Sequence, residues 1–320
     1  MLTAAALSCP VVQELYGIRI RTPWRIRGVG VCDGAWDVEF VAGDQDALER
    51  AAEHVPHDQK QRWAQYAVLP DGSAYRRWRN LFEFLVSADA RRIYARAVDG
   101  VEDEAMLAYL LVDALSFSMV RLGWEPLHAT AVLTDHGGVA FLGNSGDGKS
   151  TLAALMVRHG CKLVTDDMLV LFRDCDGWLA QPGPPRLKLY RAIADHLLGS
   201  TQNSVAMNPD TTKLIIPLDS SRCSTKAHVL KAVYILNQES DDQPRLPVIQ
   251  RLSPADAFPR LLAHTAGHYR SEPARLKRQF EFATAIVREL PFKTLSYRRD
   301  TAQTTELKDA VLADIARSIE

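Results

Sequence analysis

The chain lacks paired cysteines, a charge excess and a long apolar run. Its 320 residues include five scattered cysteines with no C-x-x-C pair, which argues against a disulfide framework or a zinc site. The net charge of −1 gives no general attraction to nucleic acid or to an anionic membrane. No stretch reaches the ~18 apolar residues of a membrane span, and the first residues carry no basic leader. We therefore expect a cytoplasmic protein that binds neither nucleic acid nor membranes.

Length and composition favour two packed domains. Hydrophobic residues make up 47% of the chain and charged residues 24%, and each domain is expected to hold about 100–200 residues. Residues 1–123 are predicted to form a small β-rich domain, with a hairpin over 80–97 and a closing helix over 102–122. Residues 124–320 are predicted to form the second domain, which becomes mainly helical from Ser253 onward.

A glycine-rich loop stands at the centre of the second domain. Residues 143–150 read GNSGDGKS and match G-x-x-x-x-G-K-[ST] in full, after an apolar strand and before a helix. In this pattern the backbone N–H groups and the helix dipole bind phosphate, Lys149 contacts the β and γ phosphates, and Ser150 binds Mg²⁺. We therefore predict ATP and Mg²⁺ as cofactors. The predicted nucleotide-binding residues are Gly143, Asn144, Ser145, Gly146, Asp147, Gly148, Lys149, Ser150 and Thr151.

Two adjacent carboxylates follow at a short distance. Asp166 and Asp167 end the predicted strand over 162–165, 16 residues after Ser150. One carboxylate can serve Mg²⁺ while the other accepts a proton from an attacking hydroxyl. The alternative is an acidic turn at the protein surface.

These features together resemble the HPr kinase/phosphorylase family. The loop is similar to that family's G-x-S-G-x-G-K-S, the segment RHGCKLVTDD resembles its R-G-H-x-L-V-x-D-D stretch, and His128 lies at a matching distance upstream. The resemblance covers about 45 residues, and the rest is similar to a looser set of HPr-kinase-like proteins, some of which phosphorylate ribosomally made peptides such as lasso peptide precursors. It implies an α/β fold, in which a P-loop HPr-kinase-like catalytic domain joins the β-rich N-terminal domain and the helical C-terminal region.

The resemblance also implies roles for individual residues. Asp166 would be the general base for a substrate serine, and Asp167 would join Ser150 in the metal site. His128 would lie near the reacting phosphate or Asp166 and act in catalysis with Lys149. The alternative is a histidine packed on a strand. The family's glycine-rich, basic signature for the reverse reaction is not found here, and the N-terminal half does not resemble its usual regulatory domain. A dedicated kinase is therefore favoured.

The predicted function is transfer of the ATP γ-phosphate to a Ser or Thr hydroxyl. The expected acceptor is a peptide or small protein, such as a lasso-type precursor peptide, and the resemblance also suggests a homo-oligomer. A kinase of an HPr-type phosphocarrier or of a small metabolite is an alternative. An ATPase switch without a phosphoacceptor is another.

Several downstream basic residues have two interpretations. Arg186, Lys188 and Lys213 either neutralise phosphate charge in the transition state or lie at the surface as ordinary charges. The 260–280 region is basic and either contacts an acidic peptide or forms a solvated helix face. Its basic residues are His264, His268, Arg270, Arg275, Lys277 and Arg278.

Overall fold

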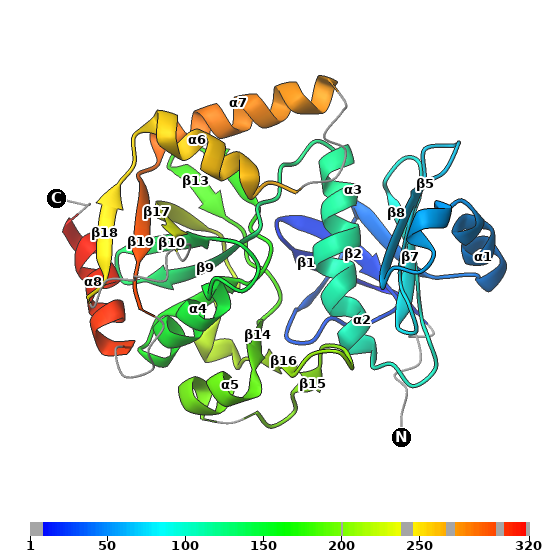
Figure 1. Cartoon of the computed structure of the whole chain (residues 1–320), viewed down its shortest axis with the longest axis horizontal. Helices are drawn as coiled ribbons and strands as arrows, with labels where there is room; N and C mark the ends of the chain where they lie inside the picture. The colour runs from blue at the N-terminus through cyan, green and yellow to red at the C-terminus, as the bar shows by residue number, and fades with distance from the viewer. Residues whose placement is uncertain (1–8, 200, 238–245, 267–272, 299–303, 318–320) are drawn as a thin grey trace. The chain divides into compact units, whose positions relative to one another are not determined.

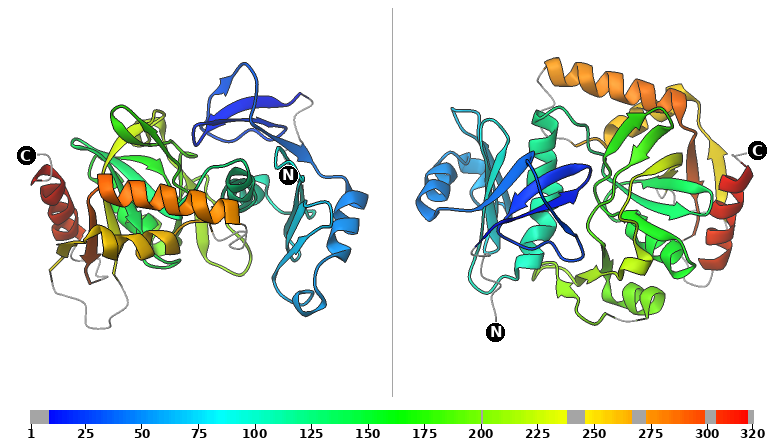
Figure 2. Two further views of the ribbon diagram at one scale, coloured as in Figure 1. Left: turned by 90° about the horizontal axis from the view of Figure 1, so that it is seen from above. Right: turned by 180° about the vertical axis from the view of Figure 1, so that it is seen from behind.

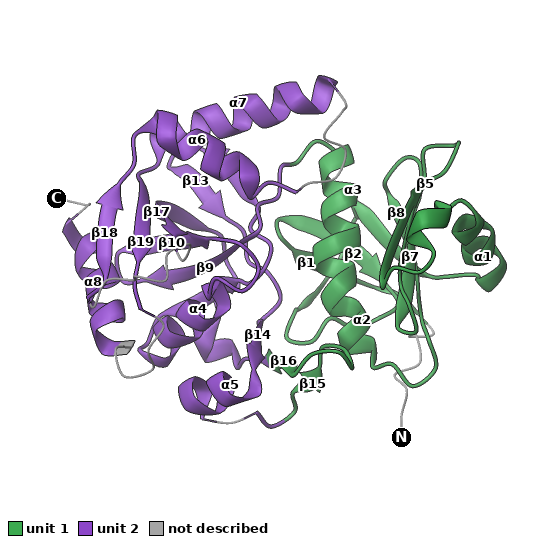
Figure 3. Ribbon diagram, viewed as in Figure 1, with its two compact units in different colours: residues 1–124, 203–216 green, residues 125–202, 217–320 purple. Residues whose placement is uncertain are grey.

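The computed structural model divides the chain into two compact units (Figure 3). The first unit contains residues 1–124 and 203–216, and the second contains residues 125–202 and 217–320. The structure describes residues 9–199, 201–237, 246–266, 273–298 and 304–317. Within these ranges, no helix has the length and apolar character needed to cross a bilayer.

The first unit is built on an eight-stranded sheet in the order β3-β1-β2-β4-β8-β7-β6-β5 (Figure 1). The alternating sequence of β2 buries Ile18 and Ile20 on one face and directs Arg19 to solvent, as a strand with one covered face requires. β7 and β8 pair antiparallel, which confirms the predicted hairpin. The strands are β1 (Val11–Leu15), β2 (Ile18–Thr22), β3 (Val31–Cys32), β4 (Val38–Ala42), β5 (Ala64–Val68), β6 (Ala74–Trp78), β7 (Phe82–Val86) and β8 (Arg92–Ala97).

Helices complete the first unit. α1 (Gln45–Glu53) begins at the cap residue Asp44, and a short 3-10 turn follows at His57–Gln59. The helix predicted over 102–122 is confirmed in position but is not uniform. It consists of α2 (Asp103–Tyr109), a π-helical turn over Leu110–Ala114 and α3 (Leu115–Arg121). The wider turn is a local irregularity that periodicity alone does not indicate.

A short segment from the second half of the chain belongs to the first unit. β15 (Val205–Ala206) and β16 (Lys213–Pro217) pair antiparallel. Ile215 packs on Ala105 and Ala108 of α2, and Asn208 Nδ2 donates to Tyr109 Oη at 2.7 Å. The boundary that the sequence predicts, at 123/124, places residues 203–216 in the second domain instead.

The second unit contains the strands around the glycine-rich loop. Its sheet has the order β11-β9-β10-β17-β13-β12, and β19 pairs with both β17 and β18. β10 and β19 run parallel to β17, whereas the other pairs are antiparallel. The strands are β9 (Ala129–Thr134), β10 (Gly137–Leu142), β11 (Lys162–Thr165), β12 (Leu171–Asp174), β13 (Gly177–Ala180), β17 (His228–Leu236), β18 (Val248–Arg251) and β19 (Phe292–Ser296).

Helices cover both faces of this sheet. Ala129 and Ala131 of β9 share a core with Leu261 of α6 and Ile286 of α7, whereas α4 packs against β9 and β11. Seen from above, α6 and α7 overlie the strands (Figure 2). The helices are α4 (Lys149–Arg158), α5 (Arg191–Leu198), α6 (Pro254–Ala263), α7 (Pro273–Glu289) and α8 (Thr304–Arg317), with a 3-10 turn over Ser220–Arg222.

The predicted α/β class with a β-rich N-terminal part is confirmed. The mainly helical C-terminal region is also confirmed by α6, α7 and α8, and one strand that was not predicted, β19, lies between α7 and α8 and completes the sheet beside β17. The sequence reading also missed β18 and β14 (Arg186–Tyr190). These strands have four or five residues, which is too short for a period of two to be distinctive. Ser253 caps α6 as predicted, with its side chain accepting from the Asp256 N–H.

Candidate functional site

The glycine-rich loop links the end of β10 to the start of α4. Gly148 precedes the helix with φ +95°, a left-handed conformation that favours glycine. A Cβ on Gly143 would lie 3.0 Å from the Cβ of Asp147 and 3.3 Å from that of Leu236, so a side chain there would be tightly packed and would require these neighbours to shift slightly. The Asp147 carboxylate accepts from the Asn144 N–H at 2.5 Å, which closes the loop on itself.

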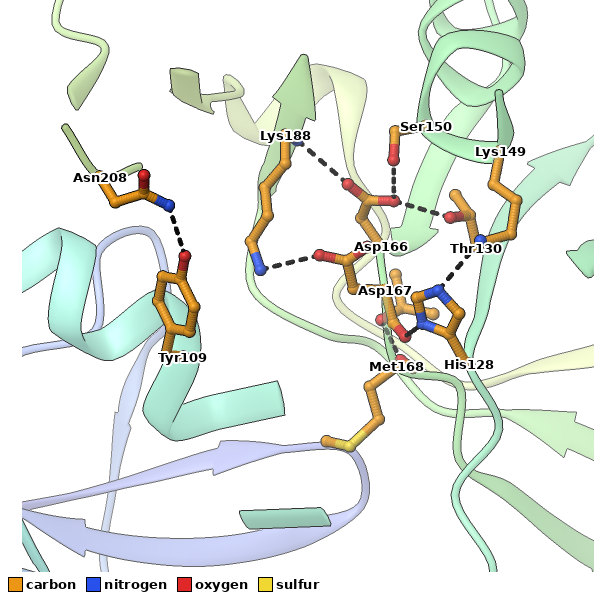
Figure 4. A network of polar contacts seen from close by, with 11 residues as sticks. Tyr109, His128, Thr130, Lys149, Ser150, Asp166, Asp167, Met168, Lys188 and Asn208 are labelled. Carbon is orange, nitrogen blue, oxygen red and sulfur yellow. Dashed lines mark hydrogen bonds and ion pairs between the residues drawn. The ribbon is translucent and has the colours of Figure 1, made fainter. Parts of the chain in front are cut away.

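Lys149 is buried beneath this loop, with 5% of its surface exposed. Its ammonium donates to the carbonyl oxygens of Gly143 at 2.7 Å and Asn144 at 2.9 Å. It also donates to His128 Nε2 at 3.0 Å (Figure 4). The first residue of α4 therefore places a cation against the concave side of the loop, at the positive end of the helix dipole.

His128 holds a defined tautomer between Lys149 and the carboxylate pair. Because Nε2 accepts from Lys149, the ring proton is on Nδ1, which donates to the Asp167 carbonyl oxygen at 3.0 Å. Burial and then the neighbouring charge of Lys149 lower the pKa of His128, so the neutral ring is favoured. His128 is therefore a connector within the site, just before β9.

Asp166 is the buried centre of the hydrogen-bond network. Its Oδ1 accepts from Ser150 Oγ at 2.8 Å and from Thr130 Oγ1 at 2.7 Å, and its Oδ2 accepts from the Lys188 N–H at 3.1 Å (Figure 4). Burial, followed by the charge of Asp167, raises the pKa of Asp166 to about 6. A cation beside this carboxylate would favour its ionised form.

Asp167 lies in the left-handed region with φ +67°, which is uncommon for a residue other than glycine. Successive side chains of an extended strand point to opposite faces, and this turn lets both carboxylates face Lys188. Asp167 Oδ2 lies 2.8 Å from Lys188 Nζ. Burial alone would raise the pKa of Asp167, but the charge of Lys188 holds it well below its usual value. Asp167 is therefore the ionised member of the pair.

The structure brings the main sequence-predicted residues into one network. Lys149, His128 and Asp167 are joined by direct hydrogen bonds, and so are Ser150 and Asp166. Lys188 links the two groups, because it contacts both Asp166 and Asp167. Thr151 follows in the first turn of α4.

Two members of the network were missed or undervalued from the sequence. Thr130 was not singled out, although it lies in β9 two residues after His128, and alternate residues of an extended chain face the same side. The sequence allows Lys188 to be either a cation that neutralises phosphate charge or a surface charge, and in the structure only 9% of its side chain is exposed. Arg186 is also buried on β14, and Lys213 belongs to β16 of the first unit.

The basic 260–280 region is not a single solvated face. His264 is buried, and burial followed by the charge of Lys149 lowers its pKa to about 4. Arg275 is 1% exposed; it pairs with the buried Glu125 at 3.4 Å and donates to the Ala266 carbonyl oxygen. Lys277 is exposed and Arg278 is partly exposed, whereas His268 and Arg270 lie outside the described residues.

The donors of this site fit a magnesium–nucleotide complex. The Ser150 hydroxyl and the Asp166 carboxylate are hard oxygen ligands held together at 2.8 Å, which is the chemistry that Mg²⁺ prefers. The loop amides, the N-terminus of the ten-residue α4 and the Lys149 ammonium are donors for phosphate oxygens. The arrangement can therefore hold a phosphate chain beside an ionised carboxylate.

Comparison with solved structures finds similar chains, one of which is a kinase/phosphatase. The chain is similar to the Hpr(Ser) kinase/phosphatase from Coxiella burnetii, at 13% sequence identity and a TM-score of 0.35, over 61% of this chain and 99% of that chain. No protein-family model and no curated protein sequence matches the chain. Functional conclusions therefore rest on the geometry of the site.

Proposed function

We propose that the protein is an ATP-dependent kinase that phosphorylates a hydroxyl group. One observation supports this most directly: the hydroxyl of Ser150 in the glycine-rich loop donates to Asp166, and a second carboxylate, that of Asp167, lies beside it and pairs with Lys188. A site that only binds nucleotide needs the loop and a metal carboxylate. A second carboxylate beside them provides a group for an attacking hydroxyl.

Each residue of the network has a part in this reaction. The loop amides and Lys149 bind the phosphates, and Ser150 with Asp166 would hold Mg²⁺, which neutralises charge on the phosphate oxygens. The acceptor oxygen forms a bond to the γ-phosphorus while the bond from that phosphorus to the β–γ bridging oxygen breaks, and ADP leaves. Asp167 orients the acceptor hydroxyl and receives its proton.

This assignment exchanges the two carboxylate roles that the family resemblance implied. The resemblance makes Asp166 the base and Asp167 the metal ligand. The hydrogen bond from Ser150 supports Asp166 as the metal carboxylate, because the hydroxyl and carboxylate that share a cation need to be neighbours. The more exposed Asp167 side chain, at 20%, is the better candidate to meet a substrate.

The proposed acceptor is a Ser or Thr hydroxyl of a peptide or small protein. This rests on the resemblance to HPr-kinase-like proteins, within which a ribosomally made precursor of the lasso type is the favoured class. The β-rich first unit, which carries no recognisable catalytic motif, would then serve substrate presentation.

Labelled nucleotide tests the proposal. The full chain is incubated with Mg²⁺, γ-labelled ATP and a set of Ser- and Thr-containing peptides, including lasso-type precursors, followed by mass mapping of modified residues. Lys149→Met is the matched control, because it removes the phosphate-facing cation and keeps most of the side-chain volume. We expect label on a peptide hydroxyl with the wild type and none with the control.

Two results would contradict the proposal. Release of labelled inorganic phosphate without any labelled acceptor would support an ATPase switch instead. Label on a small metabolite or on an HPr-type phosphocarrier, and on none of the peptides, would keep the kinase but overturn the acceptor class.

A further inference from the structure

Lys188 contacts both carboxylates of the site, each through a different atom. Its main-chain N–H donates to Asp166 Oδ2 at 3.1 Å, and its side-chain Nζ lies 2.8 Å from Asp167 Oδ2 (Figure 4). These two contacts come from one residue of β14, a strand that follows the carboxylates by about twenty positions. The spacing between the carboxylates is therefore fixed by a residue outside the loop, its helix and β11.

The lysine side chain is confined rather than solvated. It is 9% exposed and its partner Asp167 is 20% exposed, so the pair is shielded from the screening that weakens surface ion pairs. Lys149 already supplies a cation under the phosphate loop. The ammonium of Lys188 is instead directed at the carboxylate that we assign to the acceptor hydroxyl.

We propose that Lys188 is a positioning residue of the phosphotransfer site. It holds the Asp167 carboxylate in one orientation through Nζ while its N–H anchors Asp166, so that Asp167 faces the acceptor and Asp166 stays with Ser150. This role rests on the proposed kinase function. It makes phosphate transfer depend on Lys188, which acts through Asp167 and does not bind the nucleotide.

Substitutions of Lys188 distinguish a role in positioning Asp167 from a role in binding the nucleotide. In the full chain, Lys188→Met removes the ammonium, Lys188→Arg keeps a cation, and the 78%-exposed Lys277→Met is the matched surface control. The measured quantities are MgATP affinity, from a fluorescent ATP analogue, and the rate of ADP formation with and without the peptide mixture. We expect Lys188→Met to lower kcat by at least about a hundredfold with less than threefold change in affinity. Lys188→Arg should recover most of the rate.

A double variant shows whether Lys188 acts through Asp167. If it does, Lys188→Met in an Asp167→Asn background causes little further loss, because the group that it positions is already disabled. Independent roles would instead make the two losses multiply. The double variant also removes both charges of the buried pair, so it keeps the test informative where Lys188→Met alone folds poorly.

The outcomes are distinct. Absence of ATP turnover by the wild type would overturn the proposed function and this inference with it. Normal turnover by Lys188→Met, multiplicative losses in the double variant, or a loss of MgATP affinity equal to the loss of rate would overturn the role of Lys188 alone. Rescue by arginine together with non-additive losses would support it.

Discussion

Ser150 Oγ and Asp166 Oδ1 lie 2.8 Å apart although 16 residues separate them along the chain. The bond joins the start of α4 to the end of β11 and places a hydroxyl and a carboxylate where one cation can bind both. Thr130 Oγ1 donates to the same carboxylate oxygen from β9. Three elements thus hold Asp166 in position before any ligand arrives, which is the preorganisation that phosphoryl transfer requires.

Neutralising Asp166 and neutralising Asp167 should affect different properties of the reaction. We expect Asp166→Asn to raise the Mg²⁺ concentration for half-maximal turnover by about tenfold or more, since it weakens a metal ligand. Asp167→Asn should leave that concentration unchanged and lower kcat by about 10²–10⁴-fold, the range of a general base. Magnesium titrations of the steady-state rate measure both. If the magnesium requirement follows Asp167 instead, the roles implied by the family resemblance hold.

Gly148 and Gly160 form a matched pair for testing the loop. Both have positive φ, +95° and +97°, and they lie just before and just after α4. An alanine at either position should cost about 1–2 kcal/mol of stability, because the left-handed conformation places Cβ against the backbone. Only Gly148→Ala also approaches a neighbour, the Tyr297 hydroxyl at 3.1 Å.

The two glycine variants should therefore differ in their affinity for MgATP. We expect Gly148→Ala to weaken MgATP binding by tenfold or more, since the loop amides must converge on phosphate, and Gly160→Ala to leave it unchanged. Calorimetric titration and chemical denaturation of both variants provide the comparison. Equal loss of affinity in the two variants would mean that general destabilisation, and not loop shape, is responsible.

Much of the site was predictable because its chemistry is local in sequence. Residues 143–150 and the pair Asp166–Asp167 lie on one strand–loop–helix–strand unit, so that motif and spacing identify them. Lys188 could not be placed in this way, because its role depends on β14 returning to the carboxylates, which is a tertiary contact. Its surroundings PPRLKLY have no motif, and a lysine near a proline break is commonly a surface charge.

The environment of Arg275, a buried cation of α7, could not be predicted from the local sequence either. Arg275 lies in a stretch rich in Arg and Lys, so composition favours a solvated helix face. In the structure it is 1% exposed beside Glu125, whose side chain is 3% exposed and 150 positions distant in sequence. Pairing over such distances is decided by the fold, and periodicity within α7 contains no information about it.

Because the Arg275–Glu125 pair is buried, the free energy of unfolding of the second unit should depend strongly on both residues. Arg275→Met should lower the free energy of unfolding of the second unit by about 3 kcal/mol or more, because the buried Glu125 then loses its closest cation and keeps only Arg278 at 4.0 Å. The double variant Arg275→Met/Glu125→Gln should recover part of the loss. Arg288→Met, an exposed position on the same helix, should change stability by less than about 0.5 kcal/mol. Denaturant titrations of the four proteins test this, and a cost no larger than that of Arg288→Met would mean that the pair contributes little.

His264 predicts how stability responds to acid. Burial, followed by the charge of Lys149, lowers its pKa from 6.5 to about 4 in the folded protein. Between these pH values the unfolded chain binds a proton at this position that the folded chain does not. Acidification from pH 6.5 towards 4 should therefore lower the free energy of unfolding, by about 3 kcal/mol in total from this residue. Above pH 6.5 this contribution is fully present and constant.

His264→Gln removes the titrating group and keeps a polar side chain of similar size. We expect the stability difference between wild type and this variant to be constant from pH 7 to 8 and to shift in favour of the variant as pH falls to 4. Asp166, whose pKa of about 6 is raised, contributes the opposite slope, but both proteins retain it, so the difference isolates the histidine. Urea denaturation at half-unit pH steps gives the curve. A difference that stays flat down to pH 4 would show that His264 protonates in the folded protein as readily as in the unfolded chain.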